Sequence, residues 1–304
     1  MSPNTARRIA LASILLMLFC AAGAVLGEGG INVPPQFRIT PTVKLAESIA
    51  RQTAATWMPA EITAADGVAL RAWLFRPRKA NGKGVIALHG VVDSRRGALG
   101  DARILLQHGY TVLTPDSRAH GESGGIIMTY GIRETADVRL WAGYLARQER
   151  VTALYAVGHS MGASILLQAI GPGTPFRAVV AESPFATFRD VAYDRVGGIL
   201  HIRPVSRFLL WPIIEPAFAY TRLRHGIDLS TVSPLDAIGR TTVPVLLIHG
   251  TADENIPISH SRALHAANPR MTQLWEVPGA PHVAAPVVRP QEYEQRILKW
   301  FSDK

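Results

Sequence analysis

A Gly-His-Ser-Met-Gly sequence at residues 158–162 places Ser160 between two apolar runs of different character. Residues 154–157 are typical of a buried strand, and residues 163–170 continue as a helical pattern without a breaker. Glycines on both sides of a serine allow a sharp strand-to-helix turn, which exposes the hydroxyl and directs the next backbone N–H, that of Met161, toward a developing oxyanion. We therefore expect Ser160 to be a nucleophile.

A second Gly-x-Ser-x-Gly sequence, at residues 121–125, contains Ser123. This serine follows the apolar run 110–115 by several residues, and the stretch after it is a poor helix start. These glycines are typical of a flexible loop, so Ser123 is not the expected nucleophile.

A serine hydroxyl needs a base within hydrogen-bond reach and a carboxylate that orients the base. His282 lies after the last predicted strand and before the last predicted helix, at the same sheet edge as Ser160. Asp253 follows the predicted strand 243–249 at that edge, and Glu182 is the alternative carboxylate. Ligands of open α/β sheets bind at this edge, so Ser160, Asp253 and His282 are the predicted catalytic set. His260 lies in a helical pattern and is expected at the surface.

An oxyanion requires two N–H donors. Met161 supplies one, and the sharp turn after the predicted strand 84–89 predicts Val91 as the other. His89 is expected to hold this loop by hydrogen bonds, and Asp116 to tie down the loop 118–121.

The elements that must position these groups alternate between apolar runs and helical patterns. This alternation predicts an α/β fold with a doubly wound, mostly parallel eight-stranded sheet flanked by helices. Asp-Gly at residues 66–67 predicts a hairpin, so the first two strands should be antiparallel. The predicted strands cover residues 57–63, 69–76, 84–89, 110–115, 153–157, 178–181, 243–249 and 273–277. The predicted helices cover residues 96–108, 132–147, 161–170, 259–267 and 291–301.

The first residues are typical of an export or membrane segment. Arg7 and Arg8 precede an uncharged stretch, residues 9–27, which is about as long as a helix that crosses a bilayer. Charge on the short N-terminal side predicts that the rest of the chain is translocated. Small residues at 22–24 offer a cleavage site that would give a secreted or periplasmic protein, but the stretch is long for a signal peptide, so we favour an uncleaved anchor. Cys20, the only cysteine, lies in this stretch.

Three parts are predicted along the chain. Residues 1–28 form the anchor or signal segment, residues 29–52 a linker, and residues 53–304 the catalytic domain. Residues 185–232, rich in aromatic residues, prolines and arginines, interrupt the alternation and predict an inserted cap. Its apolar side chains either form a hydrophobic substrate pocket or pack on the sheet.

The formal net charge of +9 comes from arginines scattered along the chain rather than gathered in a basic run. This distribution argues against nucleic acid as a partner and is compatible with an anionic membrane surface beside the anchor. The sequence contains neither a His-Glu-x-x-His motif nor a cysteine pair, so metal catalysis is not expected.

The residues 158–162, together with the runs 88–90, 116–123, 249–257 and His282, resemble the α/β-hydrolase superfamily, in particular bacterial serine aminopeptidase-like and acylglycerol lipase-like hydrolases. The similarity extends from about residue 53 to the C-terminus. It implies hydrolysis of an ester, thioester or amide through an acyl-enzyme, with no metal or organic cofactor. Two residues differ from the common pattern, because Ala119 and Pro281 stand where glycine is frequent.

The leading hypothesis is therefore a membrane-anchored, extracytoplasmic serine hydrolase, a carboxylesterase acting on a small-molecule acyl substrate. Two alternatives remain open. One is an acyltransferase that uses the same triad, and the other is a non-catalytic hydrolase-fold module that binds a lipid or a protein at the membrane.

Overall fold

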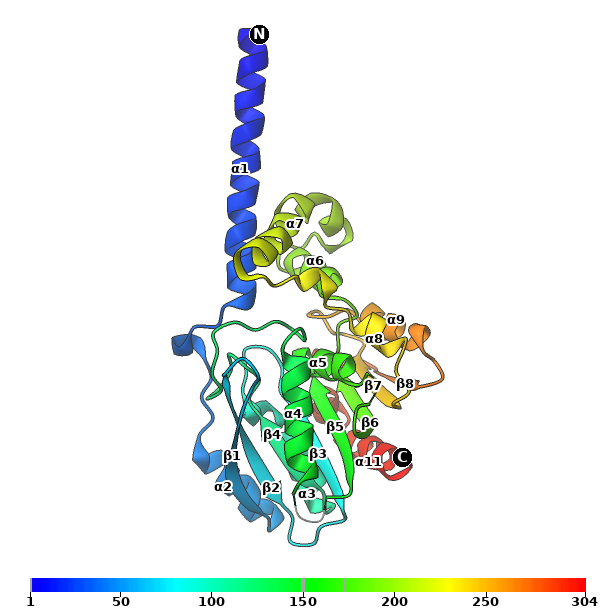
Figure 1. Cartoon of the computed structure of the whole chain (residues 1–304). Helices are drawn as coiled ribbons and strands as arrows, with labels where there is room; N and C mark the ends of the chain where they lie inside the picture. The colour runs from blue at the N-terminus through cyan, green and yellow to red at the C-terminus, as the bar shows by residue number, and fades with distance from the viewer. Residues whose placement is uncertain (1, 149–150, 172) are drawn as a thin grey trace.

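The computed structural model describes residues 2–148, 151–171 and 173–304. Its centre is an eight-stranded sheet in the order β1-β2-β4-β3-β5-β6-β7-β8 (Figure 1). β1 pairs antiparallel with β2 and β2 with β4, whereas the other neighbours are parallel. The fold class and the antiparallel first pair predicted from the sequence are confirmed. The strands are β1 (Thr56–Thr63), β2 (Ala69–Arg76), β3 (Lys83–Leu88), β4 (Thr111–Pro115), β5 (Ala153–His159), β6 (Phe176–Glu182), β7 (Val245–Gly250) and β8 (Thr272–Val277).

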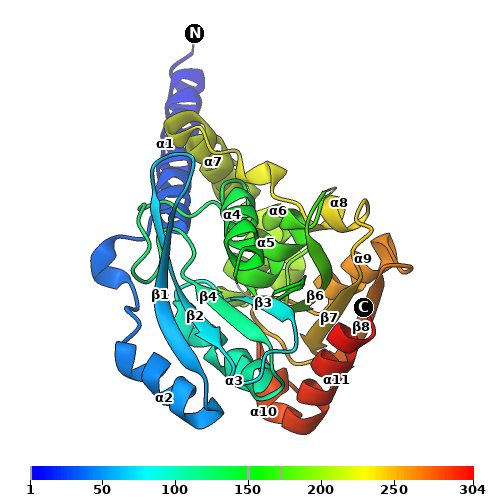
Figure 2. The same cartoon turned by 60° about the horizontal axis from the view of Figure 1, so that its bottom comes forward.

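Helices cover both faces of the sheet, which explains why the central strands are apolar along their whole length. Figure 2 shows the two helical layers on either side of the strands. One layer holds α4 (Glu134–Ala146), α5 (Met161–Ala169), α8 (Pro234–Ile238) and α9 (Ser259–Ala267). The other holds α2 (Val43–Thr53), α3 (Leu99–Gln107), α10 (Ala285–Val288) and α11 (Pro290–Ser302). Short 3-10 helices are η1 (Pro35–Phe37), η2 (Arg95–Ala98), η3 (Arg203–Val205) and η4 (Leu229–Thr231).

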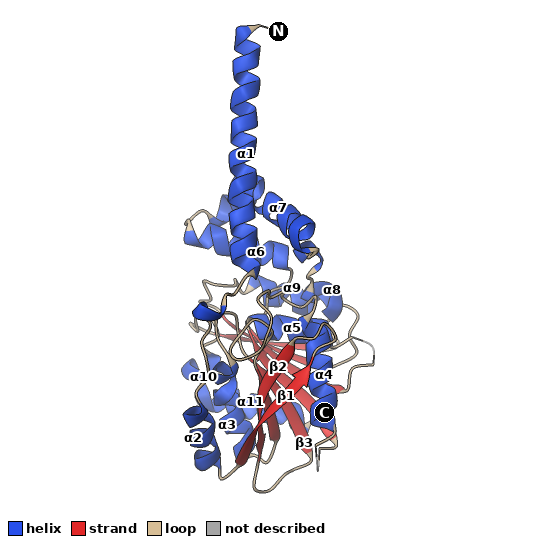
Figure 3. Ribbon diagram, turned by 60° about the vertical axis from the view of Figure 1, so that its left-hand side comes forward, coloured by secondary structure: helices blue, strands red, loops and turns tan. Residues whose placement is uncertain are grey.

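Two further helices lie above the carboxyl ends of the parallel strands. α6 (Phe188–Ile199) and α7 (Ser206–His225) follow β6, at the place where the sequence predicts an inserted cap (Figure 3). Thr187 caps the start of α6, because its side chain accepts the N–H of Asp190. Gly226, which follows the last residue of α7 in a left-handed conformation, caps the end of that helix. A third apolar cluster joins these helices to the loops below them and to Ile31 at the end of α1.

α1 (Pro3–Ile31) projects from the body, and only its last turns lie beside α7 (Figure 1). Of the described helices, α1 alone is long and apolar enough to cross a membrane, with a window Ala10–Ile31 that is 11% buried. Close packing on α7 depends on two glycines. A Cβ at Gly23 would lie 2.7 Å from Cβ of Pro216, and one at Gly27 would lie 2.9 Å from the carbonyl oxygen of Ala217.

Residues 29–52, where the sequence predicts a linker, contain the last turn of α1, η1 and most of α2. α2 has an apolar face, which contributes Ala46 to the cluster under the sheet. The segment between the two helices is also held to the body, because the N–H of Val33 donates to the carbonyl oxygen of Ile126 at 2.8 Å. The division of the chain into anchor, linker and catalytic domain stays a prediction.

Candidate active site

Ser160 occupies the turn between β5 and α5. Its backbone has φ 51° and ψ −114°, a strained conformation for a residue other than glycine. Both flanking residues must be glycine, because the neighbouring backbone approaches them too closely to admit a side chain. A Cβ at Gly158 would lie 2.8 Å from the N atom of Ala163, and one at Gly162 would lie 2.5 Å from the carbonyl oxygen of His89. The tight turn exposes the hydroxyl of Ser160 to the cavity above the sheet.

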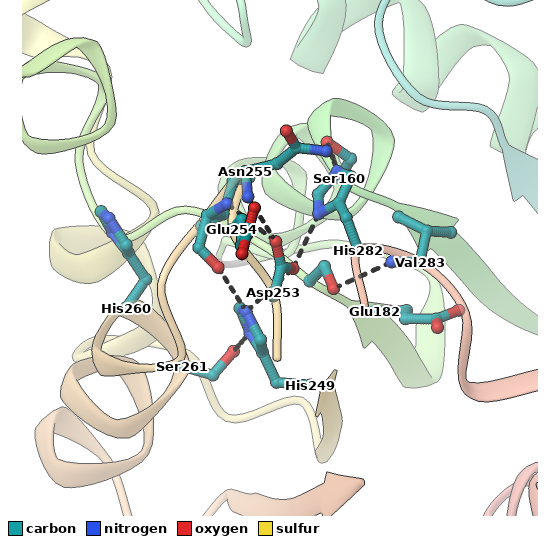
Figure 4. A network of polar contacts seen from close by, with 12 residues as sticks. Ser160, Glu182, His249, Asp253, Glu254, Asn255, His260, Ser261, His282 and Val283 are labelled. Atoms are coloured by element: carbon teal, nitrogen blue, oxygen red, sulfur yellow. Dashed lines mark hydrogen bonds and ion pairs between the residues drawn. The ribbon is translucent and has the colours of Figure 1, made fainter. Parts of the chain in front are cut away.

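The structure brings Ser160, His282 and Asp253 together from three separate loops at the carboxyl edge of the sheet (Figure 4). Nε2 of His282 lies 3.0 Å from Oγ of Ser160, and Nδ1 of His282 lies 2.7 Å from a carboxylate oxygen of Asp253. Because a carboxylate can only accept, Nδ1 carries the proton in the neutral ring and Nε2 is free to accept the serine proton. This is the geometry that activates a serine hydroxyl.

The side chain of Asp253 is fully buried and surrounded by hydrogen-bond donors. Its Oδ1 accepts the N–H groups of Asn255 and Ile256, each at 2.9 Å. Its Oδ2 lies 2.7 Å from His282 and 3.3 Å from Nε2 of His249. Burial alone would raise the pKa of Asp253, but the hydrogen bonds from His249 and His282 outweigh it and hold this pKa well below its usual range. The carboxylate therefore stays ionised and can stabilise an imidazolium at His282.

His249 is a supporting residue that the sequence reasoning did not single out. Its Nε2 lies 2.9 Å from the carbonyl oxygen of Ile256, so this nitrogen donates. Its Nδ1 then accepts the hydroxyl hydrogen of Ser261 at 2.7 Å. The ring thus ties the loop that carries Asp253 to β7 and α9.

Glu182, the alternative carboxylate, is engaged elsewhere. One of its oxygens lies 3.0 Å from Nδ1 of His159, and the other accepts the N–H of Ala285 at 2.9 Å. Nε2 of His159 contacts Asp101, which also accepts the hydroxyl of Tyr293 at 2.8 Å. Burial alone would lower the pKa of His159, but Asp101 and Glu182 raise it to about 10. The ring of His159 is therefore an imidazolium that lies between two carboxylates, next to the turn that carries Ser160. No sequence signal indicated this supporting role of His159.

The loop after β3 is held by His89. Nδ1 of His89 lies 2.7 Å from the carbonyl oxygen of Gly90, and its Nε2 accepts the N–H of Ser117 at 3.0 Å. Burial lowers the pKa of His89, which favours the neutral ring that these partners require. Since a trans peptide directs its N–H opposite to its C=O, the bond to Gly90 also fixes the direction of the Val91 N–H. Gly90, Val91, Ser160 and Met161 line the same cavity.

Asp116 and Ser123 organise the neighbouring loop. Oδ2 of Asp116 accepts the N–H of Glu122 at 2.8 Å and pairs with the buried guanidinium of Arg95. Ser123 is buried, donates its hydroxyl to the carbonyl oxygen of Asp116 at 2.8 Å, and accepts the N–H of Arg71 at 2.9 Å. The carboxylate of Asp116 and the hydroxyl of Ser123 are thus both hydrogen-bonded to backbone groups of this region, and neither contacts Ser160.

Two expectations are refined by the structure. Ala119, which stands where glycine is frequent in related hydrolases, has φ 60°, so the left-handed backbone of this loop is retained despite the methyl group. The prediction that His260 lies at the surface is wrong. This side chain is 4% exposed, because it accepts the N–H of Ala186 and contacts Asp194, which fixes the start of the cap.

The pocket beside Ser160 has a volume of about 620 Å³, within the range of ligand-binding pockets. Its polar side chains include those of Ser160 and His282, and most of the remaining wall is apolar. Among the described residues, no three His, Cys, Asp or Glu side chains are grouped so that they could hold a metal ion.

The sheet order and the turn that carries Ser160 are those of an α/β-hydrolase fold, and a family-model match makes the protein an enzyme of that type, which confirms the resemblance. The family model of the prolyl oligopeptidase family matches residues 100–304, and the chain belongs to that family.

Curated relatives and solved structures agree with this assignment. YqkD of Bacillus subtilis, an uncharacterised protein, is 28% identical over 225 residues, which cover 72% of this chain and 71% of that one. The lysophosphatidylserine lipase ABHD12 of Danio rerio is 26% identical over 190 residues, which cover 60% of this chain and 46% of that one. Esterase Pf2001 of Pyrococcus furiosus has a similar structure, with a TM-score of 0.68, 24% identity, and coverage of 89% of this chain and 98% of that one.

Proposed function

We propose that this protein is a serine hydrolase that cleaves carboxylic esters through an acyl-enzyme. The observation that carries the proposal is the continuous hydrogen-bonded path from Oγ of Ser160 through His282 to Asp253. The cavity beside Ser160 is lined mainly by apolar side chains, with Asp93 and Arg195 among its charged exceptions, and this lining favours an acyl substrate with an apolar chain. Several similar solved structures are described as esterases, Pf2001 among them.

In the proposed reaction, Oγ of Ser160 attacks the ester carbonyl carbon while Nε2 of His282 takes the hydroxyl proton. The N–H groups of Val91 and Met161 stabilise the oxyanion. The carbon–oxygen bond to the alcohol then breaks as His282 returns the proton to the leaving oxygen. A water molecule, deprotonated by His282, attacks the acyl-enzyme, and the acid leaves as Ser160 regains its proton.

A fluorophosphonate probe tests the nucleophile. The full chain in detergent should be labelled, Ser160→Ala should not be labelled, and Ser123→Ala should keep its labelling. Ser123 is the matched control because it lies in the other Gly-x-Ser-x-Gly sequence. Labelling that persists in Ser160→Ala would overturn the assignment, and a folded wild type that resists the probe would favour the non-catalytic module. Addition of alcohols during ester turnover separates hydrolysis from acyl transfer by the ratio of acid to new ester.

We further propose that α1 anchors the protein and that the catalytic body lies outside the cytoplasm. The apolar run 9–27 comprises nineteen residues and spans about 28 Å as a helix, close to the ~30 Å of a bilayer core. Gly23 and Gly27, near the end of this run, pack against α7. The whole run therefore fits the bilayer only if the exposed side of α7 also reaches the membrane surface. The exposed apolar side chains of this region support that placement, and they are Ile199, Leu200, Val205, Phe208, Leu209, Trp211 and Leu223.

A further inference from the structure

The end of α1 contributes to the wall of the active-site cavity. Leu26, Gly27 and Gly30 line it, together with Ile214 and Phe218 of α7. Ser160 and His282 line the same cavity. The residues that α1 and α7 contribute carry no charged side chain, so this part of the cavity suits an alkyl chain rather than a polar group.

α1 is fixed in this position by specific contacts. The hydroxyl of Tyr130 donates to the carbonyl oxygen of Gly30 at 2.7 Å, and Glu28 lies 2.8 Å from Nε2 of His225 at the end of α7. Ile31 is fully buried in the third apolar cluster. Cleavage at residues 22–24 would cut the helix inside its contact with α7, where Gly23 meets Pro216. The last turns of α1 are thus part of the folded body.

Two adjacent glycines at the end of α1 differ only in what they face. A Cβ at either Gly29 or Gly30 would have no neighbour within 4 Å. Gly29 is exposed, whereas Gly30 is partly covered and lines the cavity. The space beside Gly30 is therefore cavity space, and a side chain there would occupy volume open to a substrate.

We propose that the last turns of α1 and the facing side of α7 form a subsite for the linear acyl chain of the ester substrate. In this arrangement the membrane helix is retained in the mature protein and determines chain-length specificity. The inference rests on the proposed ester hydrolysis at Ser160. It names the substrate class as esters of medium- or long-chain fatty acids.

The test compares Gly30→Leu with Gly29→Leu in the full chain reconstituted in detergent. Both changes place the same side chain on neighbouring residues of one helix. The measured quantity is the ratio of kcat/KM for p-nitrophenyl octanoate to that for p-nitrophenyl acetate. Gly30→Leu should lower this ratio about tenfold or more, because the leucine fills the chain subsite. Gly29→Leu should keep the wild-type ratio. An unchanged ratio in Gly30→Leu, or an equal fall in both variants, would overturn the subsite.

A second measurement keeps this inference separate from the catalytic assignment. A diazirine-bearing fatty acid should cross-link to the buried subsite residues Ile214 and Phe218 of α7 in wild type and in Gly29→Leu. The cross-link should be lost in Gly30→Leu. If fluorophosphonate labelling fails but this cross-linking pattern holds, then the ester chemistry is wrong and the chain subsite stands. If Gly30→Leu is cross-linked as efficiently as wild type, the subsite is overturned even when Ser160 is labelled.

Discussion

Nδ1 of His159 lies 3.0 Å from a carboxylate oxygen of Glu182, and this pair joins the end of β5 to the end of β6 directly beneath Ser160. The same two strands are linked by the N–H of Ser160, which donates to the carbonyl oxygen of Glu182 at 2.8 Å. Glu182 is thus committed to holding the nucleophile turn, and Asp253 remains as the carboxylate that contacts His282.

We expect His159 to remain an imidazolium well above neutral pH. Its pKa is raised to about 10 in the folded protein, against about 6.5 in an unfolded chain. Its contribution to stability is therefore complete below about pH 6.5 and is lost as the pH rises toward 10. ¹⁵N spectra of histidine-labelled protein check the charge, and His108, which is exposed, serves as an internal control. A neutral His159 ring at pH 8 would contradict the assignment.

Gly162→Ala should destabilise the nucleophile turn. The added methyl group would lie 2.5 Å from the carbonyl oxygen of His89 and 2.8 Å from that of Leu88, and relieving such contacts costs about 1–3 kcal/mol. The apparent melting temperature and kcat for p-nitrophenyl acetate should both fall. Gly100→Ala, an exposed position in α3 with no atom near its added Cβ, is the control and should be neutral or stabilising. Equal behaviour of the two variants would argue against a tight turn.

His89 is expected to position the oxyanion loop without touching the substrate. His89→Ala removes the donor to the carbonyl oxygen of Gly90 and frees the adjacent Val91 N–H to turn away. A fall in kcat of about 10²-fold should follow with little change in KM, because the loss falls on the transition state. His89→Asn restores a donor and should recover part of kcat. A change confined to KM or to the melting temperature would indicate a structural role alone.

The exposed apolar side of α7 is expected to lie at the membrane surface. Phe208 and Trp211 are 79% and 57% exposed. Substituting both with Glu should lower hydrolysis of an ester embedded in lipid vesicles about tenfold relative to that of a soluble ester. Val287→Glu alters an equally exposed apolar residue on α10, outside the helices α6 and α7, and should leave the ratio unchanged. An equal fall of this ratio in Val287→Glu would show that the added negative charge, and not its position on α7, lowers hydrolysis of the vesicle-bound ester.

The elements that carry the triad are predictable because their sequence signals are local. β5 and β7 are short apolar runs buried on both faces, and Ser160 and Asp253 each follow one of them. β8, which precedes His282, is a half-buried edge strand in which apolar and polar residues are mixed. The glycines around Ser160 likewise indicate the turn before any tertiary contact is known.

The cap and the His159 contacts next to Ser160 could not be predicted from local sequence signals. α7 contains Pro212 and Pro216, and it has apolar residues on the side that lines the cavity, on the side that meets α1 and on the exposed side, so no simple helical period remains. The charge state of His159 depends on Asp101, 58 residues earlier, and only the tertiary fold brings the two together. α2 lies in the stretch predicted to be a linker, and it buries only two small residues, Ala46 and Ala50, so its core-facing side gives a weak sequence signal.

The contact between Gly27 and Ala217 has a consequence for biosynthesis. The two residues are 190 positions apart, so in the proposed membrane-anchored protein α1 enters the membrane long before α7 has been made. At ~5–20 residues per second, synthesis of the intervening chain takes about 10–40 s. During that interval the small-residue face of α1 has lipid, or another helix, as its neighbour. Formation of the cavity is therefore one of the last events in folding, and it couples the maturation of the active site to synthesis of the cap.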